Sequence, residues 1–372
     1  MSSLRAAVAA RSLTLRDFRN YERAELHLGD ALTVISGPNG AGKTNLLEAL
    51  YFGLTGRSCR TSNEREVVRH GACVARVAVE THDDSGEHLL EAGFQPGAPK
   101  RLRVDGALVE RLSDSPVRPL VSVFMPERLE LVKGGPSGRR AHMDQLVAAL
   151  WPARAGTRTV YARALAQRNA LLARVRGGLA AADLLDAWDA ELARHGVALM
   201  AEREEAVALV AATFSQRAGE LGLPEPARVA YRRRSRAADA DGLREELHSR
   251  RNSDLARGFT GHGPHRDELE LSHGGRSLRA FGSQGQQRVA LLALLLAERH
   301  ALAQLAQPPL LLLDDVMSEL DSARRERLGS AVREIGQTLV TATDSDAVPG
   351  VDHDVTMVEV AGGVVTGIGV PA

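Results

Sequence analysis

Eight residues near the start of the sequence, Gly37-Pro-Asn-Gly-Ala-Gly-Lys-Thr44, have the types and spacing of a phosphate-binding loop, G-x-x-x-x-G-K-[ST]. The glycines let backbone N–H groups turn toward phosphate oxygens, and the N-terminus of a following helix adds partial positive charge. We expect Lys43 to reach the β- and γ-phosphates of ATP and the Thr44 hydroxyl to bind Mg²⁺. The predicted ATP ligands are Gly37, Pro38, Asn39, Gly40, Ala41, Gly42, Lys43 and Thr44.

The residues around this loop favour the same interpretation. An apolar stretch over residues 31–35 predicts a strand entering the loop, and leucines four apart within residues 44–54 predict a helix leaving it. Lysine is rare in this chain, because only Lys43, Lys100 and Lys133 stand among 47 basic residues. A lysine in the loop therefore indicates a position that needs a compact ammonium group. The alternative, which these features disfavour, is a glycine turn that only joins a strand to a helix.

Two acidic residues follow a short run of leucines. The run, Leu310–Leu313, is typical of a buried central strand, and Asp314 and Asp315 come directly after it. The pattern resembles a Walker B segment, because ligands bind at the carboxyl ends of strands in an α/β sheet. We expect Asp314 to hold Mg²⁺ and Asp315 to be the catalytic residue that orients or deprotonates the attacking water. The alternative is that the aspartates only cap the next helix.

A second phosphate site is predicted where a long apolar helix begins, ahead of the leucine run. A hydroxyl and a glycine at a helix N-terminus can bind phosphate. The stretch resembles the signature motif of ABC-type ATPases, which meets the γ-phosphate held by the other subunit. A polar loop before a buried helix is the alternative. The predicted ATP contacts of this motif are Ser283, Gln284, Gly285 and Gln286.

Two further segments resemble parts of the same superfamily. Asp321 lies where a D-loop is expected, although it could equally cap the next helix. The superfamily often has a switch histidine farther on, where this chain has Thr343 and Asp344, and we expect one of these to sense the γ-phosphate. No glutamine typical of a Q-loop is recognisable.

The pattern of the whole chain predicts an α/β protein in three parts. Alternating apolar residues predict strands in residues 1–125, which also hold the phosphate-binding loop. Helical spacing in residues 126–225 predicts an insertion, with an ordinary helical subdomain favoured over a long coiled coil. Mixed strands and helices return in residues 226–372, which carry the signature, Walker B and D-loop segments. The predicted fold is an ABC-type P-loop ATPase head with mixed β-sheets and a helical insertion domain.

Composition and charge exclude several classes of protein. The 372 residues are 44% hydrophobic and 25% charged, as in an ordinary globular protein. The 47 basic and 47 acidic residues balance, which excludes a uniformly basic DNA-coating protein. Cys59 and Cys73 are too few for a disulfide framework, and no apolar run reaches the roughly 20 residues of a membrane-spanning helix. We therefore expect a cytoplasmic protein without a membrane partner.

Several stretches together resemble the RecF family of bacterial recombination mediators over nearly the whole length. Besides the shared ATPase motifs they are Leu15–Tyr21, Gly56–Thr61, Leu131–Gly135 with Arg139 and Arg140, Gly263–Asp267, Ser283–Arg288 and Leu313–Asp321. The resemblance implies an SMC-like head without long coiled coils, which dimerises around two ATP molecules and closes on DNA. It also implies weak, DNA-stimulated ATPase activity, binding to single-stranded, duplex and gapped DNA, and work with RecR and RecO to load RecA. Roles in DNA repair, replication and SOS induction follow from it. Cys59 and Met125 depart from the residues expected there.

Arginines are the candidate DNA contacts. Such contacts would be made mostly to phosphates and would weaken with salt. For each of these arginines a solvated surface position without a ligand is an equally good interpretation. The candidates are Arg57, Arg60, Arg139, Arg140, Arg232, Arg233 and Arg234.

Three other functions share part of these motifs. An ABC-type transporter subunit has a much shorter insertion than the one that separates Lys43 from Ser283. A P-loop kinase for a small metabolite does not need the signature motif. A structural SMC-like clamp with another partner would keep the fold and lose hydrolysis, which replacement of Asp315 would test.

Overall fold

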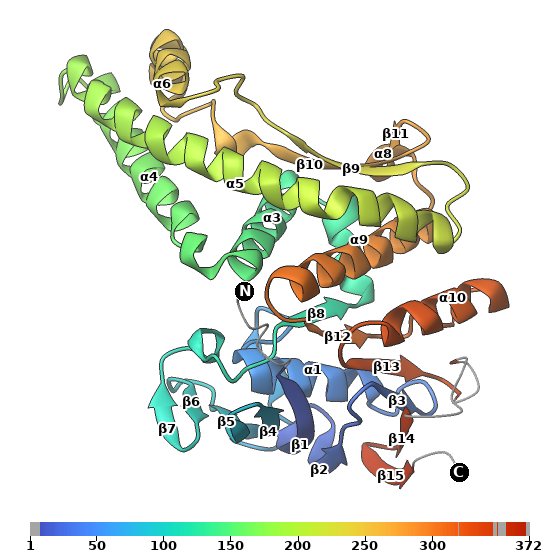
Figure 1. Cartoon of the computed structure of the whole chain (residues 1–372). Helices are drawn as coiled ribbons and strands as arrows, with labels where there is room; N and C mark the ends of the chain where they lie inside the picture. Colours follow the sequence, from blue (N-terminus) through green and yellow to red (C-terminus); the bar gives the residue numbers. More distant parts are fainter. Residues whose placement is uncertain (1–7, 319, 345–347, 349–354, 370–372) are drawn as a thin grey trace. The chain divides into compact units, whose positions relative to one another are not determined.

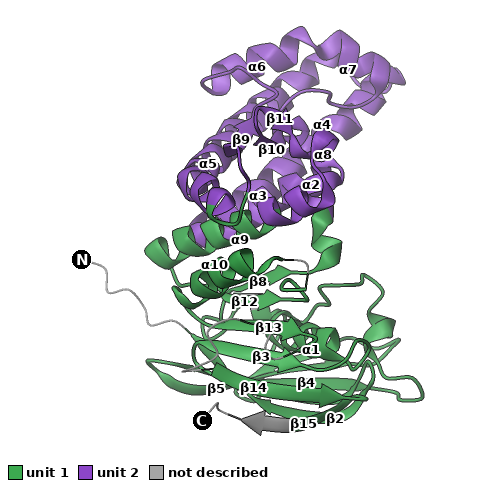
Figure 2. Cartoon of the chain, turned by 90° about the vertical axis from the view of Figure 1, so that its right-hand side faces the viewer, with its two compact units in different colours: residues 1–129, 220–222, 291–372 green, residues 130–219, 223–290 purple. Residues whose placement is uncertain are grey.

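The computed structural model describes residues 8–318, 320–344, 348 and 355–369. The chain divides into two compact units (Figure 2): unit 1 comprises residues 1–129, 220–222 and 291–372, and unit 2 comprises residues 130–219 and 223–290. This division differs from the predicted one, which placed residues 226–290 with the ATPase part. The difference arises because strand β10 (Glu268–His273) packs on helix α3 (Pro136–Leu150) of unit 2, so this stretch completes the helical insertion.

Unit 1 contains a largely parallel sheet in the order β15-β14-β3-β13-β12-β8. Strands β3 (Leu32–Ser36), β12 (Leu310–Leu313) and β13 (Thr338–Ala342) are buried over their whole length, as strands covered on both faces should be. They run parallel to β8 (Val121–Phe124) and β14 (Val355–Ala361), and β15 (Val364–Gly369) adds an antiparallel edge. Strand β13 lies between β3 and β12, so the segments that follow these three strands emerge side by side.

A second, antiparallel sheet in unit 1 has one face on the core and one toward solvent. Its order is β2 (Tyr21–His27), β1 (Ala9–Phe18), β4 (Ala75–Asp83), β5 (Gly86–Phe94), β6 (Arg101–Val104) and β7 (Ala107–Val109). Alternation of apolar and polar residues produces this two-faced sheet.

Helix α1 (Lys43–Thr55) packs on the core face of the antiparallel sheet and shares one apolar core with both sheets (Figure 1). The approach is close, since a Cβ at Gly53 would lie 2.6 Å from Val79. Helices α9 (Gln284–Leu305) and α10 (Ser322–Arg333) follow in the chain, and the division between the units falls within α9. Arg299 of α9 donates to the Val332 and Gln337 carbonyls at 3.1 and 3.0 Å, which ties α9 to the end of α10. The predicted ABC-type α/β head is confirmed.

Unit 2 is mainly helical. Its sheet has the order β11 (Arg276–Ser277), β10 and β9 (Ala227–Arg232). Buried Arg168 crosslinks its helices, donating to Asp189 at 2.6 Å and Asp254 at 2.8 Å. The other helices are α2 (Glu130–Lys133), α4 (Thr157–Arg176), α5 (Leu185–Glu220), α6 (Ala240–Ser249), α7 (Arg251–Arg257) and α8 (Leu278–Phe281).

Within the described part of the chain, no helix combines the length and apolarity that a bilayer crossing requires.

Candidate nucleotide-binding site

The predicted phosphate-binding loop leaves β3 and ends at α1. Gly37, Gly40 and Gly42 have φ angles of 148, 81 and 116°, a region that favours glycine. A Cβ at Gly37 would lie 2.1 Å from the carbonyl oxygen of Val360 in β14, and one at Gly42 would lie 2.6 Å from the Tyr21 hydroxyl. At Gly37 and Gly42, both the positive φ angle and the close approach of neighbouring atoms therefore require glycine.

Lys43 is the first residue of α1, and its side chain folds back into the phosphate-binding loop. Its Nζ donates to the carbonyl oxygens of Gly37 and Pro38 at 2.6 and 3.0 Å, and the residue is only 7% exposed. Burial lowers the pKa of Lys43, while the nearby carboxylates of Asp315 and Asp314 act in the opposite direction. The ammonium group is thus held at the loop with acidic groups close by.

Three oxygen-bearing side chains meet where β3, β12 and β13 end. Thr44 Oγ1 donates to the Asp314 carboxylate, lying 2.9 Å from both of its oxygens, and Thr341 Oγ1 donates to Asp314 Oδ1 at 2.8 Å. Burial raises the pKa of Asp314, and the hydrogen bonds from Thr341 and Thr44 oppose this shift. Hydroxyl and carboxylate oxygens are the ligands that Mg²⁺ prefers, so this donor set fits the ion. Thr44 and Asp314 are brought together as predicted.

Thr341 is a residue that the sequence analysis missed. The order β3-β13-β12 places it between the two motifs, and its hydroxyl oxygen also accepts a hydrogen bond from the Asp315 N–H at 2.9 Å. A second threonine near the carboxyl end of this short strand was the available indication. The exposed Thr343, which the sequence analysis favoured together with Asp344, comes two residues later.

Asp315 differs from its neighbour Asp314 in solvent exposure and in backbone conformation. It is exposed, whereas Asp314 is 6% exposed, and its φ of 47° is uncommon for a residue with a side chain. The Ser318 hydroxyl donates to its carbonyl oxygen at 3.1 Å, and Thr341 accepts from its N–H, so this backbone is fixed on both sides. Strained residues cluster at functional sites, and the geometry is compatible with a role toward water.

The turn between β1 and β2 also reaches the phosphate-binding loop. Asn20 Nδ2 donates to the carbonyl oxygen of Ala41 at 3.3 Å, and Asn45 Nδ2 donates to Asn20 Oδ1 at 2.7 Å. The N–H of Gly363 donates to the same Ala41 carbonyl at 3.0 Å. The loop is therefore held from outside by two segments that lie far from it in the sequence, and neither was predicted.

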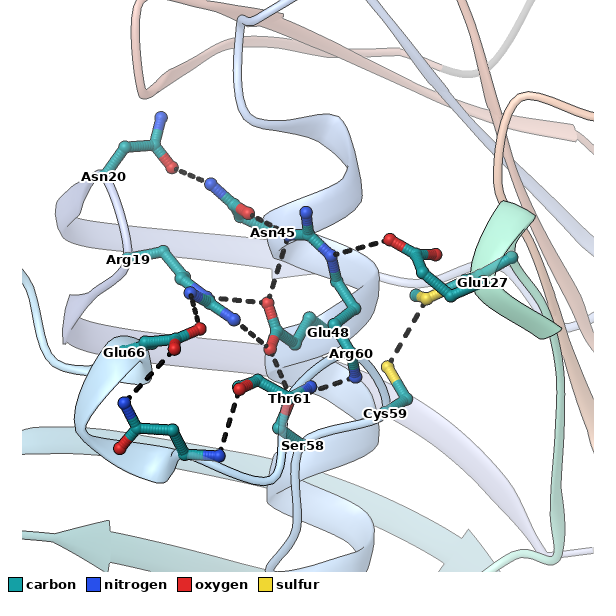
Figure 3. A network of polar contacts seen from close by, with 12 residues as sticks. Arg19, Asn20, Asn45, Glu48, Ser58, Cys59, Arg60, Thr61, Glu66 and Glu127 are labelled. Atoms are coloured by element: carbon teal, nitrogen blue, oxygen red, sulfur yellow. Dashed lines mark hydrogen bonds and ion pairs between the residues drawn. The ribbon is translucent and has the colours of Figure 1, made fainter. Parts of the chain in front are cut away.

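Behind the loop, α1 carries the fully buried Glu48, which is the centre of a polar network (Figure 3). Arg19 donates to it through Nε and Nη2 at 2.8 and 2.7 Å, and Ser58 Oγ donates at 2.5 Å. Arg60 lies 3.4 Å from the same carboxylate and donates to Asn45 Oδ1 at 2.9 Å. Arg60, a predicted DNA contact, is thus exposed but engaged beside the loop helix, and Arg57 is exposed as well.

The two departures from the family pattern contact each other in the same region. The Cys59 thiol donates to Met125 Sδ at 3.6 Å (Figure 3). Burial raises the pKa of Cys59 to about 12, so this thiol stays protonated.

The predicted signature segment lies in unit 2 and begins α9. The Ser283 N–H donates to Gln286 Oε1 at 2.9 Å, and the Gln286 N–H donates to Ser283 Oγ at 3.3 Å. This reciprocal pair is a capping box, which satisfies donors at the helix N-terminus. Ser283, Gln284 and Gly285 are exposed, so the cap leaves the segment open to a ligand. In unit 1, exposed Asp321 caps α10 by accepting from the Arg324 N–H at 2.9 Å.

The predicted DNA contacts in unit 2 differ in availability. Arg139 is 3% exposed and donates to both oxygens of Glu268, at 2.6 and 2.8 Å, and to the Gly134 carbonyl at 2.9 Å. We correct this prediction: Arg139 is a structural residue, because its guanidinium group is buried and engaged. Arg140 is partly buried and donates to the Asp267 carbonyl at 3.1 Å.

The cluster 232–234 is largely paired. Arg232 donates to Glu270 at 2.6 Å, and Arg233 pairs with Glu204. Arg234 is exposed, and its side chain has no ion pair within residues 8–318, 320–344 and 355–369.

Comparison with known proteins connects this site to a family. The AAA domain family matches residues 12–90, which include the phosphate-binding loop. The DNA replication and repair protein RecF of Anaeromyxobacter sp. (strain Fw109-5) is 40% identical over 368 residues, which cover 95% of this chain and 98% of that protein. RecF of Streptomyces avermitilis is 38% identical over 353 residues, covering 91% and 94%.

Solved structures agree with this assignment. The recombination mediator protein RecF-ATP of the RecFOR pathway has a TM-score of 0.83 at 27% identity, covering 98% of this chain and 99% of the other. The RecF-ATPrS structure has a TM-score of 0.81 at 28% identity, covering 97% and 98%. An Smc head bound to the C-winged helix domain of ScpA shares the fold, with a TM-score of 0.60, 17% identity and 96% of both chains covered. Identity of 40% over 95% of the sequence is decisive: this chain belongs to the RecF family.

Proposed function

We propose that this chain is an ATP-dependent DNA-binding recombination mediator. The observation that carries the proposal is the meeting of Thr44 and Asp314 beside Lys43 and its loop, in a chain of the RecF family. Solved RecF structures of similar fold contain ATP or ATPrS, which supports ATP as the ligand here.

Each part of the site has a role in this proposal. The N–H groups of Gly37–Thr44 bind phosphate oxygens, and the Lys43 ammonium turns from the loop carbonyls to the β- and γ-phosphates. Thr44 and Asp314 would hold Mg²⁺, which when bound supplies neutralisation of phosphate charge. Asp315 orients or deprotonates the attacking water, and Thr341 fixes the backbone of Asp315. The product pair is ADP and phosphate.

Dimerisation places a second copy's signature segment against this nucleotide. In the proposal Ser283–Gln286 and Asp321 of one copy complete the site of the other, and Thr343 or Asp344 senses the γ-phosphate. A two-fold interface of this kind is self-complementary, so one dimer holds two ATP molecules. The exposure of Ser283, Gln284 and Gly285 supports this arrangement.

Closure of the dimer then binds DNA. We propose that the protein binds single-stranded, duplex and gapped DNA, which stimulates a weak ATPase activity. It works in the cytoplasm with RecR and RecO to promote RecA loading in repair, replication and SOS induction. Candidate DNA contacts that the geometry leaves in place are Arg57, Arg60, Arg140, Arg232, Arg233 and Arg234.

Measurement of molecular mass in solution with and without ATP tests the proposal. We expect wild type to be a dimer only with ATP, Lys43→Arg to stay a monomer, and Asp315→Asn to bind ATP without turnover and remain a trapped dimer. Addition of gapped DNA should raise the wild-type rate of phosphate release. Normal hydrolysis by Asp315→Asn would disprove the role of that residue. An ATP-independent mass for wild type would disprove the dimerisation mechanism.

The same assays separate the rival functions. An ABC-type transporter subunit would show no stimulation by DNA, and a small-molecule kinase would transfer phosphate to an acceptor instead of releasing it. A structural SMC-like clamp with another partner would dimerise on ATP with no measurable turnover in wild type.

A further inference from the structure

The solvent face of the antiparallel sheet carries arginines in strict register. Strand pairing places Arg23 of β2 opposite Arg16 of β1, and Arg16 opposite Arg76 of β4. Arg76 is opposite Gly93 of β5, and Gly93 is opposite Arg101 of β6. Four guanidinium groups therefore form a line across five strands, interrupted only by a glycine. We call Arg16, Arg23, Arg76 and Arg101 the arginine row.

Acidic side chains do not neutralise the arginine row. All four residues are exposed, and among the described residues Arg23, Arg76 and Arg101 have no side-chain ion pair or hydrogen bond. Arg16 has only its sequence neighbour Asp17, at 3.8 Å. Like charges directly opposite each other in a sheet are destabilising, so the row reduces the stability of the fold. This arrangement is different from that of Arg139 or Arg19, which are engaged by glutamates.

The row also borders a hollow in the same face. A cavity of about 550 Å³ is lined by Arg16, Arg76, Arg101 and Arg103, with Gly93 between the strands and Glu91 opposite Arg103. None of the large apolar side chains that are exposed on the described surface lines this hollow. A concave basic surface concentrates positive potential, while a protein-binding surface usually offers buried apolar anchors. The hollow has the first property, with four arginines against the single glutamate Glu91, although its lining also includes the half-buried Val74 and Phe94.

We propose that the arginine row binds the sugar-phosphate backbone of DNA, an inference that rests on the proposed function and adds a contact surface in unit 1. Guanidinium groups match the geometry of phosphate and make strong charge-assisted hydrogen bonds. Four strand intervals of about 4.8 Å make the row roughly 19 Å long, which accommodates several successive phosphates of one strand. Contacts of this kind position DNA and do not read its sequence. An acidic peptide is the competing ligand.

Fluorescence anisotropy with labelled oligonucleotides tests the inference on the full chain with a non-hydrolysable ATP analogue. The test variant is Arg16→Ala/Arg76→Ala/Arg101→Ala, and the probes are a single strand, a duplex and poly-glutamate over a range of salt concentrations. The control is Arg154→Ala/Arg194→Ala/Arg244→Ala. It removes three arginines of unit 2 that pair with acidic residues, of which Arg194 and Arg244 are exposed and Arg154 is half-buried. Melting temperatures verify that both variants fold.

We expect the test variant to bind DNA at least tenfold more weakly and the control to bind like wild type. The slope of log affinity against log salt should fall in magnitude by about 2 to 3, because each lost phosphate contact removes about 0.9. An unchanged affinity and slope for the folded test variant would overturn the inference. So would loss of poly-glutamate binding with DNA binding retained. If wild type binds no DNA at all, the proposed function fails, and the inference fails with it.

Discussion

The buried carboxylate of Asp314 shows how single residues set up the site. Burial disfavours its charged form and raises its pKa, while the hydroxyls of Thr44 and Thr341 donate hydrogen bonds that favour the charge. The charged form is the one needed to hold a cation. Thr341 has a second task, because the Asp315 N–H also depends on its oxygen.

Replacement of Thr341 by valine removes both hydrogen bonds while preserving the shape of the side chain. We expect the free energy of unfolding to fall by about 1–3 kcal/mol, because a buried carboxylate and a backbone N–H lose a partner. ATP turnover should fall as well, since Asp315 loses its anchor. Urea unfolding and phosphate release measure the two effects. Thr159→Val, at an exposed position of α4 in unit 2, is the control, and equal behaviour of the two variants would contradict this role of Thr341.

His265 in unit 2 should make stability depend on pH. Its Nε2 donates to the Thr260 carbonyl at 2.9 Å, which leaves Nδ1 to accept from the Tyr161 hydroxyl at 2.7 Å. Burial lowers the pKa of His265 to about 4, so the unfolded chain, with an ordinary histidine pKa of about 6.5, binds the proton more readily. The contribution of neutral His265 to stability is present above pH 6.5 and is lost as pH falls toward 4.

Urea midpoints at several pH values between 4 and 7 test this dependence. We expect His265→Gln to be less stable than wild type at pH 7 but to lose less stability on acidification. His27→Gln, at an exposed position in unit 1, should keep the wild-type slope. A slope for His265→Gln as steep as that of wild type would rule the explanation out.

Among single residues, those that belong to a local sequence motif could be predicted from the sequence. Lys43, Thr44 and Asp314 meet because the two motifs follow strands of one sheet. Thr341 and Asn20 were not predictable from local patterns, since their roles depend on strand order and on a turn that folds back on the loop. The prediction for Arg139 was wrong because its partner, Glu268, is distant in the sequence.

Among the elements, the phosphate-binding loop is shaped by what packs around it. Its first glycine touches β14, and its Ala41 carbonyl accepts from both the β1–β2 turn and Gly363. The loop therefore depends on the C-terminal strands as well as on its own glycines. The helix and strand pattern of this region followed from hydrophobic spacing, whereas the contact with β14 is a tertiary property.

Gly37→Ala should therefore distort the phosphate-binding loop through a clash with β14. The added Cβ would lie 2.1 Å from the Val360 carbonyl oxygen, and φ at this position is 148°. We expect a loss of stability of about 1–3 kcal/mol and a strong decrease in ATP affinity, because strain of this kind is costly. Thermal unfolding and binding of a fluorescent ATP analogue measure both. Gly40→Ala is the comparison, since its Cβ would contact nothing within 4 Å although its φ of 81° is also strained. Equal effects of the two variants would show that the contact with β14 is unimportant.

For the whole molecule, the ABC-type fold was predictable, because the three motifs occur in order along the chain and each follows a typical element. The extent of unit 2 was not. Residues 226–290 look like a return to a mixed sheet, but their strands pack on the helices of the insertion. Only tertiary contacts reveal that grouping.

A mixture of two inactive variants should recover activity if two copies share each nucleotide. Lys43→Ala lacks a working loop, and Ser283→Arg blocks an exposed signature segment. In a mixed dimer one site combines the intact loop of one copy with the intact signature of the other. We expect little phosphate release from either variant alone and a clear gain from an equimolar mixture. The reference value for random pairing is about a quarter of the wild-type rate, since half of the dimers would then be mixed and each has one intact site.

Two controls belong to this experiment. Lys43→Ala mixed with Lys43→Arg should recover nothing, and Ser283→Arg should melt only slightly below the wild-type temperature, because it loses one cap hydrogen bond worth about 1 kcal/mol at an exposed position. A mixture of the two complementary variants that stays inactive would argue against sites shared between copies.

The turn that joins β1 to β2 places two surfaces of unit 1 within a few residues of each other. Arg16 and Arg23 pair on its two strands, and Asn20 at its tip touches the phosphate-binding loop through Ala41. DNA bound by those arginines would contact the same β-hairpin whose turn donates a hydrogen bond to the phosphate-binding loop. Ligands on these two surfaces would therefore be separated by a single bend of the chain, which both of them would contact or border.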